Sequence, residues 1–226
     1  MKKAATVNSM NTIGASVVSV QVGQIAPLGR EGVPSGFIKR PVKGAVMVEK
    51  LGLVGDQQAD LRVHGGADKA VYCYPIEHYA RWSEMLHGKD HLLVPGGFGE
   101  NLTTESLDEG RVCIGDIFQI GTARVQVTQP RQPCFKLALR FEDSQMIKAM
   151  VRYGLSGWYL RVLEPGLVEA GASIAMLDRP NPAWSISRLN RLLGRRGTRE
   201  EVAELAALRG LADGLRNSAR AALETE

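Results

Sequence analysis

The 226-residue sequence contains 44% hydrophobic and 23% charged residues, which is the composition of an ordinary globular domain. No apolar run approaches the roughly 18 residues that a membrane-spanning helix needs, and Lys2 and Lys3 are not followed by the apolar core of an export signal. Composition therefore excludes a membrane-spanning protein, and we expect a cytoplasmic protein with one substantial domain and a small appendage.

The net charge of +4 is concentrated near the C-terminus. From Arg179 to the end of the chain there are nine arginines and six acidic residues, a balance of +3. Because the acidic residues lie among the arginines, this segment is typical of a solvated helical surface. We therefore expect no binding to nucleic acid or to a membrane.

Short apolar or alternating runs, separated by glycine and proline, predict a series of β-strands. These strands are expected at residues 16–25, 37–42, 45–48, 70–74, 117–120, 124–127, 159–163, 167–169 and 173–177. Two interior helices are predicted at 76–86 and 142–153. Residues 1–15 show no periodicity and are predicted to be a flexible N-terminus. The pattern indicates an α+β, mostly β fold over residues 16–178, a mainly antiparallel β-barrel with flanking helices.

The composition changes at Arg179, after which the chain is rich in alanine, leucine and arginine. Helices are predicted at 185–193, from Thr198 onward and at 211–223. Thr198 and Glu201 have the spacing of a capping box. Helices this short are not stable alone in water, so they must pack on one another or on the barrel. Residues 179–226 are therefore predicted to be a small three-helix domain.

A proline-bounded loop follows the predicted strand 124–127. Pro130 and Pro133 cannot donate to a β-ladder, so the strand must end there and the loop must be stiff. Cys134 lies in this loop between Arg131 and Lys136. Cationic neighbours lower the pKa of a thiol, and a thiolate is both a nucleophile and a soft metal ligand. The alternative for this segment alone is that Cys134 is a small buried hydrophobic residue.

The other two cysteines, Cys73 and Cys113, lie in apolar runs and are predicted to fill the core. The three cysteines form no CxxC motif and their number is odd. Neither a disulfide framework nor a structural zinc site is expected.

Two glycine-rich segments, 55–69 and 95–101, also place polar side chains next to a flexible backbone. Glycine permits positive φ and lets backbone N–H groups converge on an anion. Each segment alone could equally be a turn-rich corner of the barrel. If both converge with the loop that carries Cys134, they form a cationic rim around a thiolate, which suits a ligand carrying a phosphate and a soft metal. The candidate side chains of these segments are His64, Asp68, Lys69, Glu100 and Asn101.

The ordered set of these motifs resembles the MOSC domain, the family named after the C-terminal domain of molybdenum-cofactor sulfurases. The resemblance covers about residues 16–177, and the helical tail is similar to the three-helix extension of the YiiM subfamily. The motifs that carry it are Gly55-Asp56, His64 to Ala70, Gly97 to Leu102, Gly115-Asp116 and Pro130 to Lys136.

The resemblance implies a barrel cleft that binds the molybdenum cofactor, a pterin dithiolene with a phosphate. It implies that Cys134 is the protein ligand of molybdenum and that Asp68 lies beside the metal. It also implies that Asn101 and Arg131 hold the phosphate or the pterin. From local chemistry we add His64, Lys69 and Lys136 as cofactor-binding residues.

Relatives of this kind reduce N-hydroxylated compounds, including N-hydroxylated purines such as 6-hydroxylaminopurine, to amines. The resemblance thus predicts an oxidoreductase that detoxifies N-hydroxylated bases, with Asp68 or Glu100 relaying protons to the leaving hydroxyl group. The sequence has no ferredoxin cysteine pattern and no GxGxxG fingerprint, so a separate flavoprotein reductase is expected to supply electrons. A homodimer is compatible with this prediction.

Two alternatives stay open. Cys134 could carry a persulfide in a sulfur carrier or transferase, or the protein could bind the molybdenum cofactor without turning over a substrate. The sulfurases use a separate pyridoxal-phosphate domain. A chain of this length has no room for such a domain, so no pyridoxal phosphate is expected.

Overall fold

A computed structural model describes residues 11–60, 64–194 and 197–224. Residues 1–10, which are predicted to be flexible, are not among the described residues. Arg62 and Val63 of the first glycine-rich segment are not among them either. In the described part of the chain, no helix combines the length and apolar character needed to cross a membrane.

Seven strands form a closed β-barrel, as the sequence predicts. Around the ring the order is β13-β9-β10-β11-β7-β8-β1, and β1 pairs back to β13. Only the β7–β8 pair in this ring is parallel. Closure leaves the ring without a free edge. The strands are β1 (Asn11–Val22), β7 (Val71–Pro75), β8 (Leu102–Glu105), β9 (Ile117–Ile120), β10 (Ala123–Pro130), β11 (Trp158–Glu164) and β13 (Ser173–Asp178).

The first strand begins five residues earlier than predicted, so residues 11–15 belong to the barrel. Asn11 pairs with Met176, and Ser16 pairs with Ser173. Gly14 has φ of 70°, and the register shifts between Thr12 and Ala15. This irregularity interrupts the alternation of buried and exposed residues, which is why the pattern alone missed the start of β1.

Short strands extend the barrel on one side. β5 (Val46–Glu49), β6 (Gly52–Leu53) and β12 (Gly166–Val168) form a three-stranded sheet, and β4 (Arg40–Pro41) pairs with the end of β1. The segment between the strands expected at 16–25 and 37–42 contains a hairpin of β2 (Ala26–Leu28) and β3 (Val33–Ser35).

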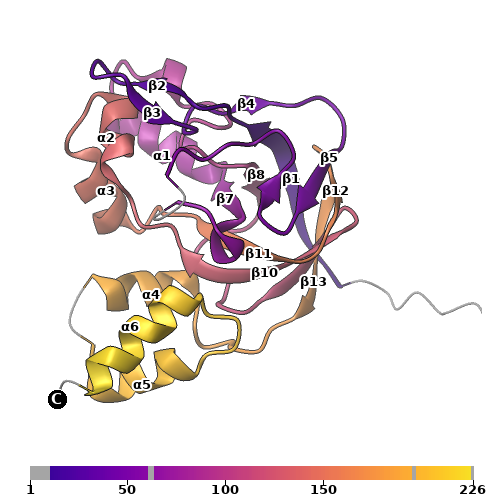
Figure 1. Ribbon diagram of the computed structural model, residues 1–226, viewed down its shortest axis with the longest axis vertical. Helices are drawn as coiled ribbons and strands as arrows, with labels where there is room; N and C mark the ends of the chain where they lie inside the picture. The colour runs from indigo at the N-terminus through magenta and orange to yellow at the C-terminus, as the bar shows by residue number, and fades with distance from the viewer. Residues whose placement is uncertain (1–10, 61–63, 195–196, 225–226) are drawn as a thin grey trace, which may run out of the picture.

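Three helices cover one end of the barrel (Figure 1). Their buried hydrophobic side chains belong to a second core cluster, which is rich in aromatic residues. The three helices are α1 (Glu77–Met85), α2 (Phe135–Phe141) and α3 (Met146–Tyr153). The single helix predicted over 142–153 is wrong at its start. Glu142 ends α2 in the left-handed region with φ of 46°, and the chain turns before α3 begins.

The C-terminal residues form α4 (Ile186–Leu193), α5 (Arg199–Ala207) and α6 (Asp213–Glu224), drawn in orange to yellow in Figure 1. Ser185 caps α4, and Thr198 with Glu201 forms the predicted capping box of α5. The helices pack on the barrel beside β10. Their buried side chains, among them Ile186 and Leu189, share one core cluster with barrel residues. The division at residue 178 stays a prediction, because the core is continuous across it.

Candidate functional site

One pocket is lined by residues from the loop that carries Cys134 and from both glycine-rich segments. It lies between the β3–β4 segment, the two glycine-rich segments and the start of α2. The residues that line it include Ser35, Phe37, Lys39, Asp56, His64, Lys69, Tyr72, Asn101, Arg131, Cys134, Lys136 and Tyr159. The sequence-based expectation that these loops converge therefore holds for the described residues.

Cys134 lies at the N-cap of α2, immediately after β10 and its proline-bounded loop. Burial raises the pKa of its thiol. A hydrogen bond with His64, the positive charge of Arg131 and the backbone N–H of Lys136 outweigh burial and lower the pKa to about 7. These contacts favour the thiolate form of Cys134. Cys73 and Cys113 are buried as predicted, and burial raises the pKa of both.

Arg131 supplies a buried positive charge to the pocket. Its side chain is 5% exposed, and its guanidinium lies 5.5 Å from the centre of the Tyr72 ring and 5.7 Å from that of Phe37. Nη1 also lies 3.3 Å from Sδ of Met150. Among the described residues, no carboxylate forms an ion pair with Arg131. The groups that favour its charge are Cys134 and the hydroxyls of Tyr72 and Tyr159 rather than a carboxylate, so the pocket fits an anionic ligand beside this buried cation.

Four further basic side chains line the same pocket: Lys39, His64, Lys69 and Lys136. Nζ of Lys136 donates to the carbonyl oxygen of Pro34 at 3.3 Å, which holds this side chain at the start of α2. Among the described residues, no group of three His, Cys, Asp or Glu side chains could hold a metal ion. A metal here would therefore need ligands from a cofactor in addition to a protein thiolate, and the residues present fit a cofactor that brings both a soft metal and a phosphate.

The structure adds an ion pair that the sequence did not reveal. Lys39 donates to Asp56 Oδ1, both side chains are almost completely buried, and both line the pocket. Asp56 Oδ1 also accepts from the backbone N–H of Gly23 at 2.7 Å. Burial lowers the pKa of Lys39, while the charge of Asp56 opposes this effect. Lys39 lies in a predicted strand of mixed composition, and no local motif indicates a buried lysine there.

Asn101 lines the pocket as predicted, but its amide is already fully bonded. Oδ1 accepts from the backbone N–H of Tyr72 at 3.1 Å, and Nδ2 donates to the carbonyl of Gln21 and to Asp56 Oδ2 at 2.9 Å. Its polar atoms connect the barrel to Asp56. Asn101 therefore fixes the positions of Tyr72 and Asp56, which also line the pocket.

Glu100 does not line the pocket. Its carboxylate is fully buried and accepts hydrogen bonds from Tyr79 Oη, the backbone N–H groups of Gly96 and Phe98, and Thr103 Oγ1. These four donors hold the second glycine-rich segment against α1. The proton-relay role predicted for Glu100 is not compatible with a carboxylate directed into this donor set.

Asp68 does not line the pocket either. Its carboxylate forms an ion pair with Arg161 and accepts from the backbone N–H of Asp213 at the start of α6. These contacts direct the carboxylate toward Arg161 and α6, and the position expected for Asp68 beside a metal stays a prediction. The structure thus brings together Cys134, Arg131, Asn101, His64, Lys69 and Lys136, and it directs the two predicted proton-relay carboxylates elsewhere.

Comparison with known proteins gives the same class of protein that the fold and the pocket indicate. The family model of the MOSC domain matches residues 60–175. YflK of Bacillus subtilis, named as an uncharacterized protein, is 45% identical over 179 residues, which cover 78% of this chain and 80% of YflK. The crystal structure of YiiM from Geobacillus stearothermophilus superposes with a TM-score of 0.78 and 34% identity, covering 92% of this chain and 99% of that structure.

A protein of Gibberella moniliformis named "Reductase" is 36% identical over 180 residues. The match covers 78% of this chain and 32% of that longer protein. On these matches, the chain belongs to the MOSC domain family. Membership supports a function associated with the molybdenum cofactor in general.

Proposed function

We propose that this protein is a molybdenum-cofactor-dependent reductase that converts N-hydroxylated compounds, such as 6-hydroxylaminopurine, to amines. The observation that carries the proposal is the pairing of Cys134, whose thiol has a pKa of about 7, with the buried cation of Arg131 in one pocket. This pair matches a cofactor that presents a soft metal at one end and a phosphate at the other.

In this proposal each side chain has a limited task. The thiolate of Cys134 is the protein ligand of the metal. The guanidinium of Arg131 holds the phosphate, with Lys136 and Lys69 adding positive charge. When bound, the cofactor supplies the two-electron chemistry that reduces N–OH to N–H with loss of water.

His64 is the side chain that we propose for proton transfer. It lines the pocket and is hydrogen-bonded to Cys134. Because its imidazole lines the pocket, whereas the carboxylates of Asp68 and Glu100 do not, His64 replaces them as the proposed proton carrier for the leaving hydroxyl group. Electrons come from a separate flavoprotein reductase in this proposal, since the sequence has no nucleotide fingerprint of its own.

The decisive experiment uses protein purified from a host that makes the cofactor. We expect about one molybdenum and one pterin per chain, and reduction of 6-hydroxylaminopurine with reduced methyl viologen as electron donor. Cys134→Ala should abolish the reduction while the protein stays folded. Cys113→Ala is the matched control, since Cys113 is a buried thiol outside the pocket, and it should keep the activity. Wild-type protein without molybdenum, or full activity in Cys134→Ala, would refute the proposal.

The lowered pKa of Cys134 also supports a second candidate, a sulfur carrier that uses a persulfide. That function predicts sulfane sulfur on Cys134 in the purified protein, released by cyanide as thiocyanate. A molybdenum-free protein with one sulfane sulfur per chain would favour it over the reductase.

A further inference from the structure

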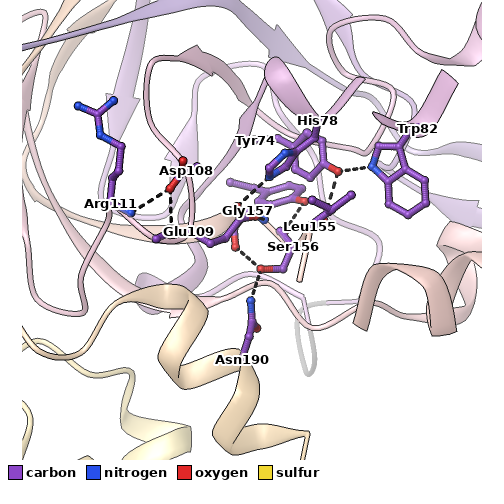
Figure 2. A network of polar contacts seen from close by, with 12 residues as sticks. Tyr74, His78, Trp82, Asp108, Glu109, Arg111, Leu155, Ser156, Gly157 and Asn190 are labelled. Carbon is purple, nitrogen blue, oxygen red and sulfur yellow. Dashed lines mark hydrogen bonds and ion pairs between the residues drawn. The ribbon is translucent and has the colours of Figure 1, made fainter. Parts of the chain in front are cut away.

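Polar contacts connect the C-terminal helices to two loops that border the pocket. The first contact starts on α4, where Asn190 Nδ2 donates to Ser156 Oγ at 2.8 Å, as Figure 2 shows. Ser156 Oγ in turn donates to the carbonyl oxygen of Gly157 at 2.8 Å. Ser156 is buried, so Asn190 holds a loop of the barrel from the tail side.

The loop that Asn190 holds lies directly behind the pocket. The carbonyl of Ser156 accepts from Tyr72 Oη at 2.8 Å, and the carbonyl of Gly157 accepts from the backbone N–H of Arg131 at 3.3 Å. Tyr72 and Arg131 both line the pocket. A shift of residues 155–157 would therefore move the two side chains that form the cation–π contact at the proposed phosphate site.

The backbone at Gly157 is packed so closely that residues 155–157 have little room to shift. It has φ of 63°, and a Cβ atom there would lie 2.3 Å from the carbonyl oxygen of Cys73. Its backbone N–H donates to the buried Glu109 at 2.6 Å, and Glu109 also contacts His78 of α1 at 2.8 Å (Figure 2). Contacts with α1, the barrel and α4 therefore restrict the position of this loop.

The second contact is made by Asp68. Its Oδ2 accepts from the backbone N–H of Asp213 at the start of α6 at 2.7 Å, and its Oδ1 accepts from Arg161 Nε at 2.8 Å. Thr128 of β10 donates to the Asp68 carbonyl at 2.6 Å. Asp68 lies four residues after His64 and directly before Lys69. Gly65 and Gly66, between His64 and Asp68, have φ of 102° and 81°. Such a glycine-rich segment keeps one conformation only when contacts outside it impose one.

We infer that the C-terminal helical unit is a positioning element of the pocket, acting through Asn190 and Asp68. Asn190 fixes the loop behind Tyr72 and Arg131, and Asp68 fixes the segment that carries His64 and Lys69. This inference rests on the proposed function only in taking the molybdenum cofactor as the ligand. It assigns Asp68 a positioning role, since within the part of the chain that the structure describes its carboxylate contacts Arg161 and α6.

The test uses hydrogen–deuterium exchange on the full-length, cofactor-free protein. Asn190→Ala should increase exchange in peptides covering 155–159, and Asp68→Ala should increase it in peptides covering 64–70, each by roughly tenfold or more in rate. Asp68→Asn keeps an oxygen that can accept from Asp213, so it should restore part of the protection. The control is Val202→Ala on α5, which weakens the packing of the helical unit and leaves both contacts in place. It should change neither segment.

The second measurement is retention of pterin by the loaded protein during dialysis. Outer contacts of this kind change the affinity of a bound group by roughly tenfold, so Asn190→Ala and Asp68→Ala should lose pterin about ten times faster than wild type and Val202→Ala. Unchanged exchange in both segments would overturn the inference. So would an Asp68→Asn protein that keeps its exchange pattern and pterin but loses turnover per bound cofactor, because Asp68 would then act at the cofactor itself.

These results separate the inference from the proposed function. A wild-type protein that holds no pterin would refute the proposed function, while the exchange experiment would still decide whether Asn190 and Asp68 hold the two segments. Pterin-loaded wild type with unchanged variants would refute the inference alone.

Discussion

The guanidinium of Arg131 lies 5.5 Å from the centre of the Tyr72 ring, so a buried positive charge of the pocket lies over an aromatic face. Tyr72 in turn is held by the carbonyl of Ser156. A lysine cannot reproduce this contact between a guanidinium and the aromatic ring.

We expect Arg131→Lys to retain positive charge but bind pterin roughly tenfold more weakly or worse, because the loss of charge-assisted, planar hydrogen bonding costs about 1.5–3 kcal/mol. Arg131→Ala should lower pterin content further. Pterin per chain after extensive dialysis measures the effect. Arg124→Lys is the control, since Arg124 forms an ion pair with Glu164 away from the pocket. Equal pterin content in wild type and Arg131→Ala would place the anion site elsewhere.

Alkylation of the cofactor-free protein should report the lowered pKa of Cys134. The thiolate is the reactive form, so the rate of reaction with iodoacetamide should rise with pH through a midpoint of about 7 and level off above it. His64→Ala removes a hydrogen bond that favours the thiolate and should move the midpoint to higher pH. Peptide mapping identifies the modified residue. A wild-type midpoint near 9 would contradict the environment described for Cys134.

The buried pair of Lys39 and Asp56 should be essential for stability. Asp56→Asn leaves Lys39 buried without its counter-charge, and we expect a loss of about 3–5 kcal/mol in the free energy of unfolding, measured with urea. Because burial lowers the pKa of Lys39, the loss measured near neutral pH should shrink as the pH rises and the lysine of the variant deprotonates. Glu164→Gln, which breaks the exposed pair with Arg124, should cost at most about 1 kcal/mol.

Glu100→Gln tests whether this carboxyl acts in catalysis or in folding. Four donors point at the carboxylate, and an amide must direct its NH₂ group at some of them. We expect a loss of stability of about 1–3 kcal/mol for each donor left unsatisfied, with unchanged turnover per bound cofactor. A normally stable variant with lost turnover would instead return Glu100 to the role of proton relay.

Elements with a strong local pattern could be predicted from the sequence. The hairpin around Gly121, helix α1 and the capping box of Thr198 and Glu201 all follow rules that act within a few residues. The boundaries at Asn11 and Glu142 could not, because a bulge and a left-handed residue break the periodicity there.

The sequence by itself determined which residue types the pocket contains: a thiol between basic residues and two glycine-rich segments with polar side chains. It also determined the order of the motifs that identify the family. Only the tertiary structure decided where each side chain points. Asp68 and Glu100 occupy motif positions that indicate chemistry, yet Asp68 binds Arg161 and the start of α6, and Glu100 binds backbone donors. The physical reason is that a carboxylate accepts from whichever donors surround it. In a closed barrel those donors come from strands and helices far apart in the chain, so local sequence contains no record of them.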